Sequence, residues 1–171
     1  EGLAFDRCKV AIVTNMGAGD HLGLNYITTL EDLSVLKRVI VLNVEQNGMA
    51  VLNAADPAVV SMAHHCPGDV TFFALDAHQP VLAAHRAQGK RVVFTDDGDI
   101  VAQKGKQIFR IPLANVPLTR QGQIGFQTEN VMAAVAAAWA VNVPWDAIAQ
   151  GLATFISDIQ GVPGRFNVFD Y

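Results

Sequence analysis

The stretch KVAIVTNMGAGDHLG, residues 9–23, joins an apolar run to a glycine-rich loop. Its first part, Lys9–Thr14, is mostly apolar and β-branched, a composition typical of a buried strand. The following segment, Asn15–Gly23, contains three glycines in nine residues. In parallel α/β sheets, ligands bind at the carboxyl ends of strands, in loops placed as this one is. We therefore take residues 15–23 as the first candidate for a ligand-binding loop.

The sequence beyond this loop alternates between helix and strand patterns. Thr28 or Thr29 can cap a helix whose first turn carries Glu31 and Asp32, two acidic residues that favour the positive end of the helix dipole. The elements predicted next are a turn at Asn47-Gly48, a strand at Met49–Leu52, a helix opened by Asp56-Pro57 and a strand at Val70–Leu75. This alternation predicts an α/β domain with a mainly parallel sheet flanked by helices.

The second half of the chain begins with short strand patterns separated by hairpin-turn signals. Asp97-Gly98 and Lys104-Gly105 lie between three such patterns, which predicts a small antiparallel meander beside the main sheet. The strands expected in it are Arg91–Thr95, Ile100–Gln103 and Gln107–Ile111. Two helices should follow, an alanine-rich one at Glu129–Val141 and another from Pro144 to about Phe155. Glycine and proline at 161–164 then indicate a linker.

Composition excludes several classes of protein. The chain has 171 residues, 51% hydrophobic and 16% charged, which is enough apolar material for a folded core. Its 12 basic and 16 acidic residues give a net charge of −4, without the basic surplus of a nucleic-acid-binding protein. The longest apolar stretch, Val131–Val143, is shorter than the roughly 18–20 residues of a membrane helix. Two cysteines suit the reducing cytoplasm, where we expect the protein to act.

Five side chains could carry chemistry, and each also has an ordinary structural explanation. Asp20 and His21 offer a carboxylate and an imidazole in the glycine-rich loop, or a turn cap and a surface histidine. Gln127 and Asn130, near the start of the alanine-rich helix, could bind the edge of an adenine or cap the helix. Arg165 could bind a phosphate or be solvated. A Gly-x-x-x-x-Gly-Lys-Ser/Thr loop does not occur, so these residues alone predict only an α/β ligand-binding domain.

Several segments, in chain order, resemble the central domain of the Mur ligase superfamily. The match begins with the loop sequence Thr14-Asn15-Met16 to Gly23 and continues through Thr29–Leu33. Val51–Pro57 resembles the Asn-Ala-Asp-Asp motif of that superfamily, although Ala55 replaces its first aspartate. Phe126–Ala134 resembles its Asn-Ala-Leu-Ala-Ala helix, and Pro163–Asn167 the junction with its C-terminal domain. Within the superfamily, three segments are most similar in sequence to the cyanophycin synthetases. They are Gly2–Cys8, Asp20–Gly23 and Gly164–Asn167.

The resemblance implies a role for each matched residue. His21 would hold a magnesium ion, Asn130 would hydrogen-bond adenine with Gln127 beside it, and Arg165 would reach the phosphates of ATP. In this family, ATP phosphorylates a carboxylate, and an amine attacks the acyl phosphate to form an amide. In cyanophycin synthetases the amine is arginine and the carboxylate is an aspartate side chain of a growing polymer. The expected partners are therefore ATP, arginine and a polymer primer, in an intact protein expected to be a homo-oligomer.

The resemblance also implies how the chain divides. Residues 1–160 would be the central ATP-binding domain without its N-terminal phosphate-loop part, and residues 161–171 a linker and the start of the C-terminal ligase domain. We expect such a fragment to bind Mg·ATP weakly or not at all, and not to turn over. Two alternatives remain open. One is a related Mur or folylpolyglutamate ligase, and the other is a scaffold or interaction module that keeps the fold without its chemistry, as Ala55 suggests.

Overall fold

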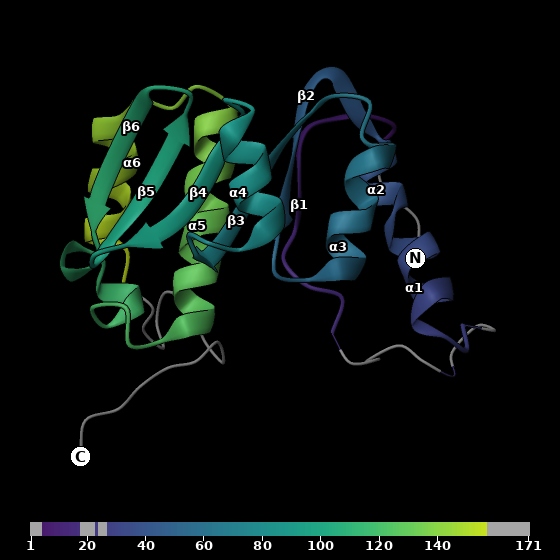
Figure 1. Ribbon diagram of the computed structural model, residues 1–171, viewed down its shortest axis with the longest axis horizontal. Helices are drawn as coiled ribbons and strands as arrows, with labels where there is room; N and C mark the ends of the chain where they lie inside the picture. The colour runs from purple at the N-terminus through teal and green to yellow at the C-terminus, as the bar shows by residue number, and fades with distance from the viewer. Residues whose placement is uncertain (1–4, 18–22, 24–26, 157–171) are drawn as a thin grey trace.

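A six-stranded sheet with helices on both faces confirms the predicted α/β architecture (Figure 1). The computed structural model describes residues 5–17, 23 and 27–156, so the boundary predicted near residue 161 lies outside the described residues. The strands follow one another across the sheet in chain order: β1 (Cys8–Val13), β2 (Val44–Asn53), β3 (Asp69–Asp76), β4 (Val92–Asp96), β5 (Asp99–Lys104) and β6 (Gln107–Pro112). Pairing is parallel from β1 to β4 and antiparallel from β4 to β6.

Alternation along the strands divides the core into two layers, because successive side chains point to opposite faces of a sheet. Val51 and Phe73, both fully buried, belong to the layer under α5 (Gly125–Ala140) and α6 (Trp145–Thr154). Their neighbours Leu52 and Phe72 belong to the other layer. That second layer is covered by four short helices: α2 (Val39–Leu42), α3 (Pro57–Ser61), the 3-10 helix η1 (Met62–His65) and α4 (Pro80–Ala87). The central strands are thus buried on both faces, as parallel sheets require.

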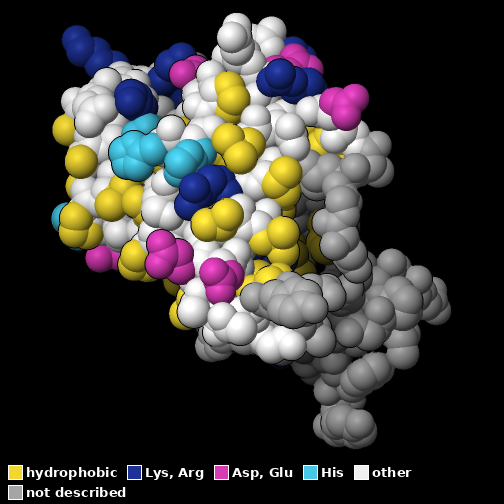
Figure 2. Space-filling view, turned by 90° about the vertical axis from the view of Figure 1, so that its right-hand side faces the viewer, with side chains coloured by type: hydrophobic (Ala, Val, Ile, Leu, Met, Phe, Trp, Pro, Cys, Tyr) yellow, Lys and Arg dark blue, Asp and Glu magenta, His cyan; other side chains and the backbone are white. Residues whose placement is uncertain are grey.

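The helix after the glycine-rich loop, α1 (Leu30–Lys37), begins at one of the two predicted caps. Thr29 is its N-cap: the Thr29 hydroxyl accepts a hydrogen bond from the backbone N–H of Asp32, and the Asp32 carboxylate accepts one from the backbone N–H of Thr29. Together with α2 it leaves large apolar side chains exposed, on the face of the molecule shown in Figure 2. They are Leu30, Val35, Leu36, Val39 and Leu42.

The predicted turn at Asn47-Gly48 is wrong, because both residues lie inside β2. Between the pairs Cys8–Val44 and Val10–Met49, β2 advances five residues while β1 advances two, so β2 bulges out at this point. The Lys9 ammonium donates a hydrogen bond to the Asn47 side-chain oxygen at 2.8 Å and thereby holds the bulge against β1. The glycine and asparagine therefore mark an irregularity within a strand and not its start.

The remaining elements agree with the prediction only in part. The predicted meander is confirmed, and it continues the main sheet, since β4 pairs with β3 on one side and with β5 on the other. Helix α4 has no counterpart among the predicted elements. The alanine-rich helix α5 begins at Gly125, four residues before the predicted start, after two 3-10 turns, η2 (Leu113–Asn115) and η3 (Pro117–Thr119). Among the helices described, none is long and apolar enough to cross a membrane.

The buried side chain of His85 joins α4 to the sheet. Its Nε2 lies 2.9 Å from the carbonyl oxygen of Val70, and its ring meets the Phe72 ring edge-on at a centroid distance of 4.9 Å. Because a carbonyl only accepts, Nε2 carries the proton in the neutral imidazole. Burial lowers the pKa of His85, and the positive charge of Lys90 acts in the same direction, against the hydrogen bond to Val70 and the charge of Asp69.

Acid should therefore weaken the fold through His85. As the pH falls below the ordinary histidine pKa of about 6.5, His85 takes up a proton in the unfolded chain before it does so in the folded chain. The contribution of neutral His85 to the free energy of unfolding is therefore fully present above that pH and is lost as the pH falls below it. We expect His85→Gln to keep a donor for Val70, to cost about 0.5–1.5 kcal/mol at pH 7 through loss of the ring contact, and to reduce the further decline toward pH 5. Thermal unfolding from pH 5 to 8, with the exposed His78→Gln as control, tests this. An unchanged pH profile in His85→Gln would contradict it.

Candidate functional site

The carboxyl edge of the parallel strands gathers the segments that the sequence analysis singled out. The strands β1, β2 and β3 end there at Val13, Asn53 and Asp76, and the glycine-rich loop leaves from the first of them. The N-terminus of α5 lies at the same edge, because a Cβ atom on Gly125 would be 3.8 Å from Cδ1 of Leu75 in β3. The ends of three strands and the start of the longest described helix therefore lie at one edge, the usual position of a ligand site in such a sheet.

The buried side chain of Asn53 connects β2 to α5. Its amide nitrogen donates a hydrogen bond to Oε1 of Glu129 at 3.3 Å, and its Oδ1 accepts one from the backbone N–H of Ala55 at 2.8 Å. Asn53 is only 6% exposed, so both polar ends of its side chain are satisfied inside the protein. Glu129 is not among the site residues predicted from the sequence. The only signal for it was its place between Gln127 and Asn130.

The carboxylate of Asp56 holds the beginning of the glycine-rich loop. Its Oδ1 accepts hydrogen bonds from the backbone N–H groups of Ala58 and Val59, which makes it the N-cap of α3 as predicted. Its Oδ2 accepts the backbone N–H of Met16 at 2.8 Å. One aspartate thus ties the loop after β1 to the turn after β2. Ala55, which replaces the first aspartate of the motif, is exposed beside it.

Gln127 and Asn130 are brought together on the first turns of α5. The Asn130 amide nitrogen donates a hydrogen bond to Oε1 of Gln127 at 3.1 Å. Gln127 is buried and Asn130 is exposed, so the inner amide holds the outer one at the surface. Their interpretation as helix caps is wrong, because α5 begins at Gly125 and its N-cap is Ile124, which makes no side-chain capping bond.

The other predicted site residues, His21 and Arg165, lie outside the described residues, as does Asp20. Among the residues that are described, no group of three or more histidine, cysteine, aspartate or glutamate side chains could hold a metal ion. Both cysteines, Cys8 and Cys66, are free, and burial raises the pKa of each thiol. The described part of the edge therefore offers the amide pair of Gln127 and Asn130, the buried amide of Asn53, and the hydrogen-bonded carboxylates of Asp56, Asp76 and Glu129.

Comparison with known proteins shows the family of the chain. The Mur ligase middle domain matches residues 3–138, which is most of the chain. The chain belongs to the Mur ligase family. As a Mur ligase middle domain it is 38% identical over 170 residues to a protein of Crocosphaera subtropica named cyanophycin synthetase, and 37% identical over 171 residues to one of the same name from Synechocystis. The alignments cover 99% of this chain and 19% of each relative, so the chain spans about a fifth of their length.

Solved structures agree on the fold of this Mur ligase middle domain. Crystal structure II of MurF from Acinetobacter baumannii has a TM-score of 0.55 at 19% identity, over 85% of this chain and 28% of that one. A pseudomurein peptide ligase type C from Methanothermus fervidus also has a TM-score of 0.55, at 16% identity, over 88% of this chain and 34% of that one. The predicted α/β class and the predicted family are both confirmed.

Proposed function

We propose that this Mur ligase middle domain is the ATP-binding part of an amide ligase of the cyanophycin synthetase type. The observation that carries the proposal is the similarity to several proteins of that name, 35–38% identical over 99% of the chain. A Bacillus licheniformis ligase that is named for UDP-N-acetylmuramoyl-L-alanyl-D-glutamate and 2,6-diaminopimelate is 29% identical. The relatives of higher sequence identity are those named cyanophycin synthetase, which favours cyanophycin synthesis over peptidoglycan synthesis.

The proposed reaction joins arginine to the side-chain carboxylate of an aspartate in a growing Asp–Arg polymer. The carboxylate takes the terminal phosphoryl group of ATP and becomes an acyl phosphate, with ADP as the leaving group. The amine of arginine then attacks the acyl carbon, an amide bond forms, and inorganic phosphate leaves. In this proposal residues 1–160 belong to the ATP-binding domain, and residues 161–171 lead into the C-terminal domain.

The amide pair on α5 supports adenine binding. One N–H of Asn130 is used on Gln127, which leaves Oδ1 and the second N–H of the Asn130 amide available. An acceptor and a donor on one amide match the N6 amino group and N7 of adenine, which a single asparagine can bind together. Gln127, buried on the inner side, would act as a positioning residue by fixing which way the Asn130 amide faces.

His21 and Arg165 are proposed for the phosphate end of the nucleotide, on the strength of the family resemblance. Magnesium prefers oxygen ligands, and the described residues supply no cluster for it, so phosphate oxygens, water and His21 would hold the ion. Bound magnesium would neutralise charge on the phosphoryl group during transfer. Asp56 would support His21 from a distance, because it fixes the start of the loop that carries it.

Ala55 supports a second candidate, a scaffold that keeps the fold without chemistry. It places an exposed methyl group where the family motif has an aspartate. Asp56 nevertheless makes two structural contacts, to α3 and to the loop, so this turn is held in place with alanine at position 55. We therefore rank the ligase first.

Phosphate release by the full-length protein tests the choice. We expect ATP to be hydrolysed to ADP and phosphate only when arginine and an Asp–Arg primer are both present, and His21→Ala to abolish that release. If phosphate release does not depend on arginine but depends on another amino acid, the protein is a different ligase of this family. No release with any amino acid would favour the scaffold, and full activity in His21→Ala would remove the metal role.

A further inference from the structure

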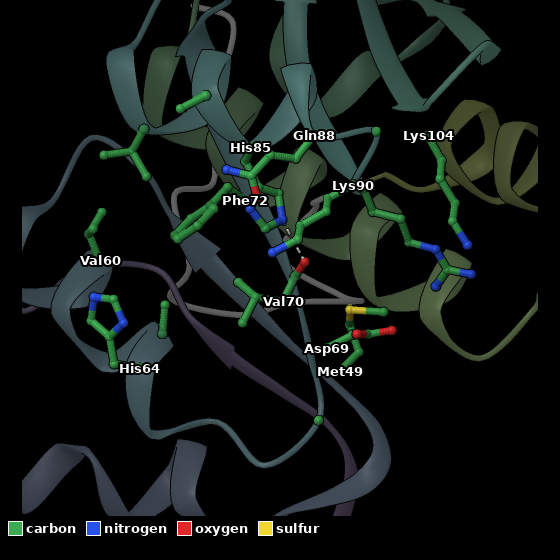
Figure 3. Close-up of a pocket in the computed structure, with 16 residues that line it drawn as sticks. Met49, Val60, His64, Asp69, Val70, Phe72, His85, Gln88, Lys90 and Lys104 are labelled. Carbon is green, nitrogen blue, oxygen red and sulfur yellow. Dashed lines mark hydrogen bonds between the residues drawn. The ribbon is translucent and has the colours of Figure 1, made fainter.

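A cavity of about 720 Å³ opens at the amino edge of the parallel strands, opposite the edge that carries Asn130 (Figure 3). Met49 and Asp69 line it where β2 and β3 pair at their amino-terminal side. Strand β3 runs from Asp69 in this cavity to Asp76 at the other edge, seven residues further along the chain and roughly 23 Å away. The cavity is therefore separate from the proposed nucleotide site, and its volume is in the range of small-molecule sites.

One part of the cavity is apolar. Val60, Val70 and Val81 line it together with the ring of Phe72, which is held edge-on by His85. Figure 3 shows His64 and Val60 on one side of this part and His85 with Phe72 on the other. Because His85 is itself hydrogen-bonded to the carbonyl of Val70, the Phe72 side of this part is held in place. They suit an apolar or aromatic body.

The other part of the cavity is cationic. Lys90, Arg91 and Lys104 line it, and Asp69 is the only acidic residue among the described side chains that line it. The ion pairs found among the described residues involve Lys9 and Arg110, so none of the three cations has an acidic partner there. Three positive charges against one negative charge, two of them on the adjacent residues Lys90 and Arg91, leave an unbalanced positive field in a concave site.

Arg91 adds a fixed and poorly solvated donor. Its guanidinium carbon lies 4.8 Å from the centroid of the Trp139 ring, and its Nε is buried with no hydrogen-bond partner. Stacking on the indole restrains the guanidinium plane while leaving its in-plane N–H groups free to form hydrogen bonds, the geometry that recognises carboxylates and phosphates. A guanidinium partly removed from water attracts an anion more strongly than a solvated one does.

We infer that this cavity binds a small anionic molecule, in which a phosphate or carboxylate group is attracted by the positive field of Lys90, Arg91 and Lys104 and an apolar or aromatic body lies in the apolar part of the cavity. The inference does not depend on the proposed ligase function, since the cavity and the Asn130 edge share no residue. It gives the middle domain a second ligand site at the edge away from the nucleotide.

Calorimetric titration of the full-length protein tests the inference, with phenyl phosphate and phenylacetate as probes. We expect one of them to bind, and the preferred probe to show whether phosphate or carboxylate is the natural group. Lys90→Gln and Lys104→Gln should each weaken that binding at least about tenfold, the effect of losing a charge-assisted hydrogen bond. Both lysines are exposed, so their replacement should leave the melting temperature unchanged.

Two controls separate this site from the rest of the protein. Lys106→Gln removes an exposed lysine two residues from Lys104 that does not line the cavity, and it should leave probe binding unchanged. Asn130→Ala should also leave probe binding unchanged. The proposed nucleotide site and the proposed anion site can therefore be tested independently of each other. Absence of binding by both probes at millimolar concentration, or equal weakening by Lys90→Gln and Lys106→Gln, would overturn the inference.

Discussion

Replacing Asn130 by alanine in the full-length protein should raise the KM for ATP roughly 10- to 100-fold. The Asn130 amide has one N–H bonded to Gln127 and keeps a donor and an acceptor for the adenine edge. Losing both would leave the polar edge of the base without partners, at a cost of this order. Steady-state kinetics with varied ATP measures the effect. The KM for arginine should stay unchanged, because arginine does not contact this amide in the proposed arrangement.

Selectivity between nucleotides gives this prediction a second readout. Oδ1 of Asn130 would accept from the amino group of adenine, whereas guanine presents a carbonyl oxygen at that position. Asn130→Ala should therefore lower the preference for ATP over GTP as well. Gln127→Ala should produce a smaller change in the same direction, because Gln127 acts only by orienting Asn130. Gln150→Ala, which removes an exposed amide from α6, should leave both quantities unchanged. Unaltered ATP kinetics in Asn130→Ala would rule out the adenine role.

Replacing Gly68 by alanine should destabilise the fold by about 3 kcal/mol or more. A Cβ atom on Gly68 would lie 2.5 Å from the carbonyl oxygen of Gly48 and 2.6 Å from that of Glu45. Both are backbone atoms of the β2 bulge, which is hydrogen-bonded to β1, so relief requires moving the strand itself. Overpacking against rigid neighbours costs amounts of this order. The apparent melting temperature and the denaturant midpoint of the protein should both fall sharply.

Gly151 in α6 provides the matched control for this substitution. No heavy atom lies within 4 Å of the position that its Cβ would occupy. Alanine has the higher helix propensity, so Gly151→Ala should leave stability unchanged or raise it by about 0.5–1 kcal/mol. If Gly68→Ala melted at the same temperature as Gly151→Ala, the close approach between β2 and the start of β3 would not exist in solution.

The sequence predicted best those elements whose signals are local. Asp97-Gly98 marks a hairpin turn because both residues adopt a positive φ there, 48° and 78°, a conformation that glycine takes freely and aspartate tolerates. Thr29 and Asp32 form their capping box within a single turn. Helix α4 escaped prediction because its N-cap is Gln79, a residue type outside the usual capping set, whose side chain accepts from the backbone N–H of Leu82.

Elements that depend on distant partners were predicted less well. Val44 lies in β2 because it pairs with Cys8, 36 residues earlier, and this pairing carries the strand through Asn47-Gly48 despite the turn signal. The candidate site shows the same division. Family motifs pointed to Gln127 and Asn130, but the bond between them and the tie from Glu129 to Asn53, 76 residues apart, became visible only in the structure.

By itself, the sequence determined the α/β alternation, the hairpins, the caps of α1 and α3 and the family, because these depend on residues within a few positions of one another or on the sequences of motifs. The tertiary structure alone decided that the carboxyl edge assembles Asn53, Asp56, Glu129 and Asn130, and that Lys90, Arg91 and Lys104 line one cavity at the amino edge. The reason is geometric. Parallel pairing places the ends of strands that are far apart in the chain side by side, and no local pattern encodes which of their side chains will then meet.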